Sequence, residues 1–167
     1  MPEQRTLERA QKAKREGKSP KTQAGEFVRE EIEHIRSGKH GARSTKQAIA
    51  IGLSKARKAG IDLPPPAKGK VSEKTRRSAA RAYAQGQSGH SHKTSPTRSR
   101  AIIGVLKRES HQAASSQALA RQGKQAARQR TATERSASAR KGMSKRSPAE
   151  RSASAQKAAR TRARTRS

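Results

Sequence analysis

The clearest hydrophobic pattern lies in residues 23–37, where apolar positions recur at spacings of three and four. Such positions fall on one face of an α-helix, and here they are Ala24, Phe27, Val28, Ile32 and Ile35. Gly38 follows directly and predicts the end of this helix, because glycine readily adopts the left-handed conformation of a helix C-cap.

A second amphipathic helix is predicted for residues 44–59. Ser44 with Gln47 three residues later forms a capping-box pattern, which marks a helix N-terminus. At the other end Gly60-Ile61 has the pattern of a Schellman stop. A short polar loop, residues 39–43, joins the two helices, so the pattern predicts an antiparallel helical hairpin. The apolar stripe of the second helix consists of Ile49, Gly52, Leu53 and Ala56.

The large apolar side chains of both helices would form the hairpin core, which then consists of Phe27, Val28, Ile32, Ile35, Ile49, Leu53 and Ile61. A core of that size is marginal for independent stability. Residues 3–16 also have helical composition, but Leu7 is their lone large apolar group, so this helix should fray unless it docks. We therefore predict an N-terminal helical module over residues 1–63, with its hairpin at about 22–61.

Beyond the module the apolar pattern weakens. Pro64, Pro65 and Pro66 form a stiff spacer that no helix can cross. Residues 64–97 have linker composition with a weak helix at about 72–85, and residues 98–130 predict an Ala/Arg-rich helix.

Residues 131–167 predict a disordered basic tail, in which the sequence that begins at Glu134 recurs sixteen residues later at Glu150. The expected fold is all-α: a small N-terminal helical hairpin module, Ala/Arg-rich helices and a largely disordered basic C-terminal tail.

Composition limits what such a chain can do. The 167 residues include 41 Lys and Arg against 12 Asp and Glu, a net charge of +29, and no cysteine. Only 16 residues are Ile, Leu, Val or Phe, and low apolar content with high net charge is typical of disorder. A large enzyme core and the shaped pocket that acid–base or nucleophilic catalysis needs are therefore excluded. We expect no enzymatic activity.

The distribution of charge indicates the partner. Residues 1–63 carry a net charge of +7 and residues 64–167 carry +22, while residues 121–167 alone hold 15 basic and 2 acidic residues. Clustered Lys and Arg at this density are the electrostatic footprint of a nucleic-acid-binding protein. A basic arm of this kind binds phosphate by releasing condensed counterions, which favours any sequence equally.

Candidate phosphate contacts fall into two groups. The first lies at the ends of the predicted helix 44–59, where the N-terminal N–H groups and the helix dipole favour an anion; the alternative is that Ser44 only caps the helix and the cations are solvated. The members of this group are Arg43, Ser44, Lys46, Lys55, Arg57 and Lys58. The second group belongs to the C-terminal segment and consists of Arg128, Arg130, Arg140, Lys141, Arg160, Arg162, Arg164 and Arg166.

Acidic and histidine residues suggest no further chemistry at this stage. The glutamates of the first helix predict a solvated acidic face, formed by Glu26, Glu30, Glu31 and Glu33. Along the sequence His34, His40 and His111 stand alone, and the pair His90 and His92 has no cysteine or carboxylate nearby, so we expect no metal site and no cofactor. The most apolar stretch, residues 48–53, is far too short for a membrane span.

Short motifs add a resemblance. Ser95-Pro96-Thr97-Arg98 has the Ser-Pro-x-basic form of DNA-compacting tails, with partial matches at Ser19-Pro20 and Ser147-Pro148. The run Gly-Lys-His-Gly-Ala-Arg-Ser-Thr-Lys-Gln-Ala-Ile-Ala-Ile-Gly-Leu-Ser-Lys-Ala-Arg at residues 38–57 resembles the signature of small basic bacterial proteins. These proteins carry a conserved domain of unknown function and are often labelled DNA-binding or histone-like.

The resemblance spans about residues 20–63, with looser similarity at residues 99–102 and 117–121. It implies a nucleoid-associated binding protein of the bacterial cytoplasm without enzymatic activity, and it supplies no catalytic or base-reading residues. The resulting hypothesis is sequence-nonspecific DNA binding that compacts or protects the duplex. An RNA- or ribosome-associated protein is one alternative, and an adaptor that uses the acidic helix face is another.

Overall fold

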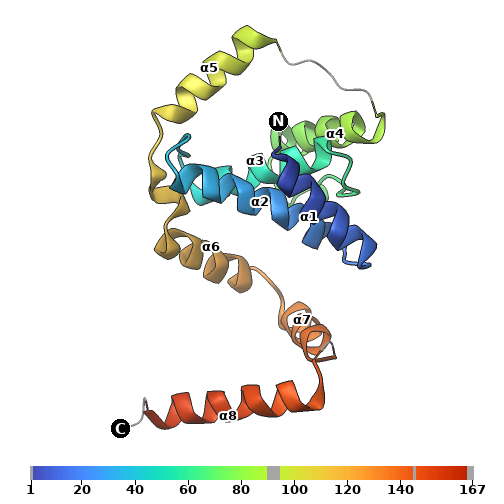
Figure 1. The fold of residues 1–167 in the computed structure, drawn as a ribbon, viewed down its shortest axis with the longest axis vertical. Helices are drawn as coiled ribbons and strands as arrows, with labels where there is room; N and C mark the ends of the chain where they lie inside the picture. Colours follow the sequence, from blue (N-terminus) through green and yellow to red (C-terminus); the bar gives the residue numbers. More distant parts are fainter. Residues whose placement is uncertain (1, 90–94, 145, 165–167) are drawn as a thin grey trace. The chain divides into compact units, whose positions relative to one another are not determined.

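A computed structural model of the chain describes residues 2–89, 95–144 and 146–164, and these residues form helices and connecting turns without a strand (Figure 1). The all-α prediction is therefore confirmed. The chain divides into two compact units, residues 1–122 and 123–167, which are described separately below. In chain order the elements are α1 (Gln4–Arg15), α2 (Pro20–Arg36), α3 (Thr45–Lys58), α4 (Glu73–Gln87), α5 (Pro96–Lys107), the 3-10 helix η1 (His111–Ala114), α6 (Ser116–Arg128), α7 (Ala132–Ser144) and α8 (Pro148–Arg164).

Helices α2 and α3 form the predicted hairpin and pack closely together (Figure 1). The contact depends on small residues of α3, because Ala48, Gly52 and Ala56 recur every fourth position on its buried face. A Cβ atom on Gly52 would lie 2.6 Å from the Cα atom of Val28. The hairpin thus crosses at a point where only glycine fits.

The close crossing changes the core that the sequence predicted. Phe27 and Ile35 are fully buried as expected, but most of their partners are alanines rather than large side chains. Ile49 and Leu53 are only half-buried and line an open groove of about 900 Å³ between α3 and α4. The buried face of α3 is therefore centred on Ala48 rather than on Ile49 and Leu53. Small side chains on this face let the backbones of α2 and α3 approach each other.

The predicted caps are present at the C-terminus of α2 and at both ends of α3. The Ser44 hydroxyl accepts a hydrogen bond from the Gln47 N–H at 3.2 Å, and the Gln47 side chain in turn accepts one from the Arg43 N–H at 2.8 Å. Gly38 and Gly60 both have positive φ, 76° and 83°, and each ends its helix with the expected reversal of the chain.

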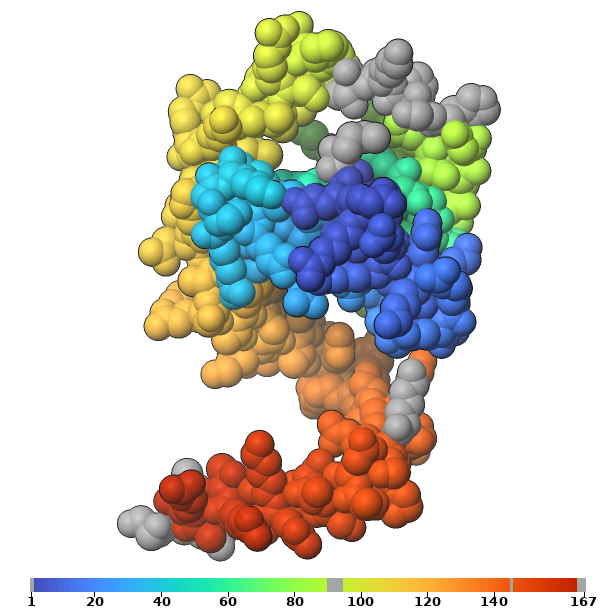
Figure 2. Space-filling view, viewed as in Figure 1, coloured from blue at the N-terminus to red at the C-terminus, as the bar shows by residue number. Residues whose placement is uncertain are grey.

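Helix α1 docks on α2. The sequence predicted that this helix would fray unless it docked on another part of the chain. Its buried residues are Thr6, Ala10 and Ala13, and its one large apolar side chain, the partly buried Leu7, packs against the cluster that contains Phe27. In the space-filling view, the side chains of α1 and α2 form one continuous surface (Figure 2). Alanine at the interface again allows a close helix–helix approach.

The first unit continues through the three prolines instead of ending at them. Helix α4, expected as a weak helix in a linker, begins at the Ser72 cap and packs on α3. The Tyr83 hydroxyl donates a 2.7 Å hydrogen bond to the Asp62 carboxylate. Gly86 lies against the carbonyl of Arg57, where a side chain would have no room. Residues 64–89 thus belong to the folded unit.

The segment expected as one helix from 98 to 130 forms three helices in the structure. Residues 110–115 turn inward, and Ala113 and Ala114 of η1 are buried against α2 and α3. The Thr45 hydroxyl donates to the Ala113 carbonyl at 2.7 Å, and the Arg36 Nε donates to the Ala114 carbonyl at 2.9 Å. These contacts bring a distant part of the chain onto the hairpin, which the local pattern did not indicate.

The second unit contains α7 and α8, so a disordered tail is not confirmed for the described part of residues 131–167. Both helices start with a capping box. The Thr131 N–H donates to the Glu134 carboxylate and the Ser147 N–H to the Glu150 carboxylate, each at 2.8 Å. The bond from Ser147 lowers the pKa of Glu150. The sixteen-residue repeat is therefore a repeated helix with its own N-terminal cap.

Candidate functional site

Four of the six candidate phosphate contacts near α3 are exposed at its ends. Arg43, Ser44 and Lys46 surround the N-terminus of the helix, and no acidic residue lies in its first turn. Lys58 is exposed at the C-terminus. The Ser44 hydroxyl is used as a cap, so the groups that remain for an anion are the two cationic side chains and the helix N-terminus.

Two other candidates on α3 are held inside the first unit. Arg57 is 7% exposed; its Nε donates a 3.0 Å hydrogen bond to the Leu63 carbonyl, and its Nη2 contacts the Pro64 carbonyl at 3.5 Å. Burial lowers the pKa of this guanidinium. Arg57 thus ties the turn after α3 to the helix, and its position offers little to an external phosphate.

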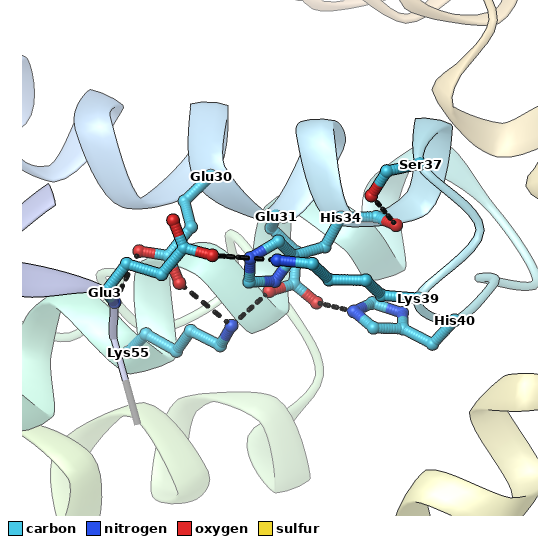
Figure 3. Close-up of polar contacts among 8 residues, drawn as sticks. All are labelled: Glu3, Glu30, Glu31, His34, Ser37, Lys39, His40 and Lys55. Carbon is cyan, nitrogen blue, oxygen red and sulfur yellow. Dashed lines mark hydrogen bonds and ion pairs between the residues drawn. The ribbon is translucent and has the colours of Figure 1, made fainter. Parts of the chain in front are cut away.

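Lys55 is the second inward cation. Its Nζ lies 2.6 Å from the Glu31 Oε2 and 3.5 Å from the Glu30 Oε1 (Figure 3). Its side chain is 24% exposed, whereas Glu30 and Glu31 are 3% and 1% exposed. The ammonium therefore compensates two buried carboxylates.

The prediction of a solvated acidic face on α2 is wrong for these two glutamates. Glu30 and Glu31 point between α2 and α3, and Glu26 is half-buried, while Glu33 is exposed and pairs with Arg29 at 3.0 Å. Helical periodicity alone could not show this burial, because the compensating lysine lies on the other helix of the hairpin. Buried carboxylates require such a partner.

Glu3 extends the same network from the start of α1 (Figure 3). Its carboxylate accepts hydrogen bonds from Lys39 at 2.8 Å and from the His34 ring at 2.7 Å, and its backbone N–H donates to Glu30 at 3.1 Å. The bonds from Lys39 and His34 lower the pKa of Glu3 to about 2. This exposed carboxylate connects the first helix to the end of α2.

The histidines His34 and His40 lie close together, which corrects the prediction from the sequence that each stands alone. Their rings lie edge to face with centroids 6.2 Å apart, and together with Glu31 they place one potential ligand atom each within 4.8 Å of the others. The His40 Nε2 lies 3.2 Å from the Glu31 Oε1. The signal for this cluster is the i, i+3 spacing of Glu31 and His34 combined with the tight turn at Gly38, which returns the chain over the helix end.

The second group of candidates lies at the end of α6 and in the second unit, where the side chains are exposed; these are Arg128, Arg130, Arg140, Lys141, Arg160, Arg162 and Arg164. Arg166 lies outside the described residues, as do His90 and His92. Helices α7 and α8 contain no buried residue. The cations of both helices are therefore exposed to solvent.

Substitutions of Arg57 and of its exposed neighbour Lys58 directly test whether the buried Arg57 has a structural role. Replacing Arg57 by glutamine should lower the free energy of unfolding by about 1–3 kcal/mol, because the buried Leu63 carbonyl loses its charged donor. Chemical denaturation measures the change. Lys58→Gln is the matched control and should change stability by less than about 0.5 kcal/mol. Equal effects of the two substitutions would contradict the structural role of Arg57.

Comparisons with known proteins concern mainly the hairpin. Residues 11–68 match the family of unknown function DUF6496. This range contains α2, α3 and the turn that Arg57 holds, so the matched segment corresponds to the hairpin with its buried charges. The comparisons with curated proteins and with solved structures gave no match. In the described ranges, no helix combines the length and apolarity needed to cross a membrane.

Proposed function

We infer that the protein binds nucleic acid without sequence preference, through the phosphate backbone, and that it acts as a binding protein rather than an enzyme. One observation carries the proposal: residues 123–167 hold 14 basic and 2 acidic residues, and the helices of this segment bury none of their side chains. With only 2 carboxylates against 14 cations, the segment cannot neutralise its own positive charge. DNA is the favoured partner, which would place the protein on the bacterial nucleoid.

The driving force is electrostatic. Each Lys or Arg that neutralises a phosphate releases a condensed counterion, and this gain does not depend on base sequence. Direct base readout needs side chains that reach base edges in a groove, and RNA readout commonly needs exposed aromatic rings. The chain has one Phe, which is fully buried, and one Tyr, whose hydroxyl bonds Asp62. The chemistry present therefore favours backbone binding.

The first unit supplies a smaller share of the contacts. Arg43 and Lys46 at the start of α3 and Lys58 at its end are separated by about 20 Å, the length of a fourteen-residue helix. Lys55 and Arg57 are left out of the proposed interface because their cations bind groups of the protein itself. The adaptor alternative also loses support, because Glu30 and Glu31 are buried and cannot present an acidic face.

The helices of the second unit should depend on the bound polyanion. Helices of 13 and 17 residues that bury no side chain are marginal in water, and their cations repel one another. We expect residues 123–167 to be largely disordered in the free protein at low salt and to become helical when phosphates neutralise them. Far-UV circular dichroism during a DNA titration should then show a rise in helicity, and an unchanged spectrum at saturation would contradict coupled folding.

Fluorescence anisotropy with two duplexes of equal length and unrelated sequence tests the proposed function. The two dissociation constants should agree within about threefold, since base contacts typically contribute about 1–3 kcal/mol each and none is expected. Structured RNA as competitor then decides between DNA and RNA: equal displacement by mass supports a general phosphate binder, and strong preference for RNA supports the ribosome-associated alternative. Absence of binding to either polymer would refute the proposal.

A further inference from the structure

We propose that Glu31, His34 and His40 form a binding site for a divalent transition-metal ion, and we expect that ion to be Zn²⁺. The three residues lie at the C-terminal end of α2 and in the turn that follows (Figure 3). Two imidazoles with one carboxylate are a donor set that suits zinc, which binds three protein ligands and leaves a fourth position open. The site is separate from the proposed phosphate contacts.

The backbone brings the three donors together. Glu31 and His34 are three residues apart on a helix, so they lie on the same face. The turn at Gly38, with φ of 76°, folds the chain back and places His40 over that face. One potential ligand atom from each residue then lies within 4.8 Å of the others. A side-chain adjustment of about an ångström would close such a group around an ion.

One edge of the site already has the required spacing. The His40 Nε2 lies 3.2 Å from the Glu31 Oε1. Two ligands bound at about 2.0–2.1 Å in a tetrahedral arrangement lie about 3.3 Å apart. This pair could therefore bind an ion almost without movement. The remaining adjustment falls on His34, whose side chain is 14% exposed.

The hydrogen bonds of the two rings are those of metal-binding histidines. The His40 Nδ1 donates to the Gly41 carbonyl at 3.0 Å, and the His34 Nε2 donates to the Glu3 carboxylate at 2.7 Å. Backbone carbonyls and carboxylates commonly fix the second nitrogen of a ligating imidazole in this way. Each neutral ring then has its lone pair on the other nitrogen, and for His40 that nitrogen faces a carboxylate oxygen.

Two acceptors that face each other at 3.2 Å need a cation between them. Either a proton on the His40 ring or a metal ion supplies it. The Glu31 carboxylate is 1% exposed, and its other oxygen contacts Lys55 at 2.6 Å, so the lysine leaves Oε1 available. The observation that points to a cationic ligand here is a histidine ring nitrogen 3.2 Å from a carboxylate that is only 1% exposed.

Calorimetric titration of the full chain with Zn²⁺ tests the proposal. To remove the other histidine pair, the titrated protein should carry His90→Ala and His92→Ala. We expect binding of one ion per chain, and the double substitution His34→Gln and His40→Gln should weaken it at least about 100-fold. His111→Gln, an exposed histidine outside the cluster, is the matched control and should leave the affinity unchanged. Unchanged affinity in the double variant, or no binding at all, would overturn the assignment.

Spectroscopy provides a second readout that does not require a folded variant. Co²⁺ in place of Zn²⁺ should give the visible absorption bands of a tetrahedral site. In NMR spectra of the chain with His90→Ala and His92→Ala, the ring signals of His34 and His40 should shift on Zn²⁺ addition while those of His111 stay in place. Shifts at His111 alone, or at no histidine, would overturn the assignment of the site to Glu31, His34 and His40.

Discussion

Deleting residues 123–167 should lower the affinity for duplex DNA by about 100-fold or more near 0.1 M salt. The deletion removes 14 basic and 2 acidic residues, and with them the helices that bury no side chain. Residues 1–122 keep the hairpin, α1, α4 and η1, so their thermal unfolding should remain cooperative with little change in Tm. Anisotropy and calorimetry on the two proteins measure both effects.

The matched control keeps the charge and changes only the repeat. Replacing Ser136, Ser138, Ser152 and Ser154 by alanine leaves every Lys and Arg of the segment in place. This variant should bind DNA as the full chain does, because phosphate neutralisation depends on the cations. If the truncated protein binds as tightly as the full chain, the second unit is not the main binding element.

Replacing Lys55 by methionine should destabilise the first unit by about 3–5 kcal/mol, because it leaves Glu30 and Glu31 buried without their lysine. Methionine keeps most of the apolar length of the side chain, so the loss comes from the charge and not from a cavity. Urea denaturation measures the change in unfolding free energy. A loss of this size is a large fraction of the stability of a small domain.

Lys46→Met is the control for Lys55, since Lys46 lies on the same helix and is exposed. It should change the stability by less than about 0.5 kcal/mol and weaken DNA binding a few-fold. Lys55→Met should lower the stability and leave DNA binding unchanged, provided that binding is measured at a temperature where the variant is folded. A Lys55 variant with full stability and weakened DNA binding would show that this lysine contacts the nucleic acid after all.

The elements of the hairpin could be predicted because their signals are local. Ser44 with Gln47, and the glycines after each helix, specify caps through bonds to residues a few positions away. The periodic positions Phe27, Ile32 and Ile35 identified the buried face of α2. Each of these features depends on the sequence within one or two turns, so one sequence is enough to find it.

Features that depend on distant partners were missed. Nothing near Glu31 in the sequence indicates that Lys55, 24 residues later, compensates its charge. Nothing near residue 113 indicates that the Thr45 hydroxyl bonds its carbonyl, 68 residues away. Lys55 and Arg57 were predicted as phosphate contacts because sequence alone cannot tell an exposed cation from one that binds its own chain.

The Ser-Pro motifs show how a local pattern can have a second meaning. Ser19-Pro20 and Ser95-Pro96 each occupy the N-cap and first position of a helix, α2 and α5, and Pro148 is the first residue of α8. Proline is favoured at that position because its missing N–H is not needed there. The motifs therefore account for helix starts, whether or not the same segments also contact DNA.

The salt dependence of duplex affinity tests the central claim most directly. For the full chain, the logarithm of the association constant should fall linearly with the logarithm of salt concentration, with a slope of about −6 or steeper. Residues 1–122 should give a distinctly shallower slope, and the difference counts the phosphates that residues 123–167 neutralise. A slope near zero for the full chain, or equal slopes for the two proteins, would contradict backbone binding through the basic C-terminal segment.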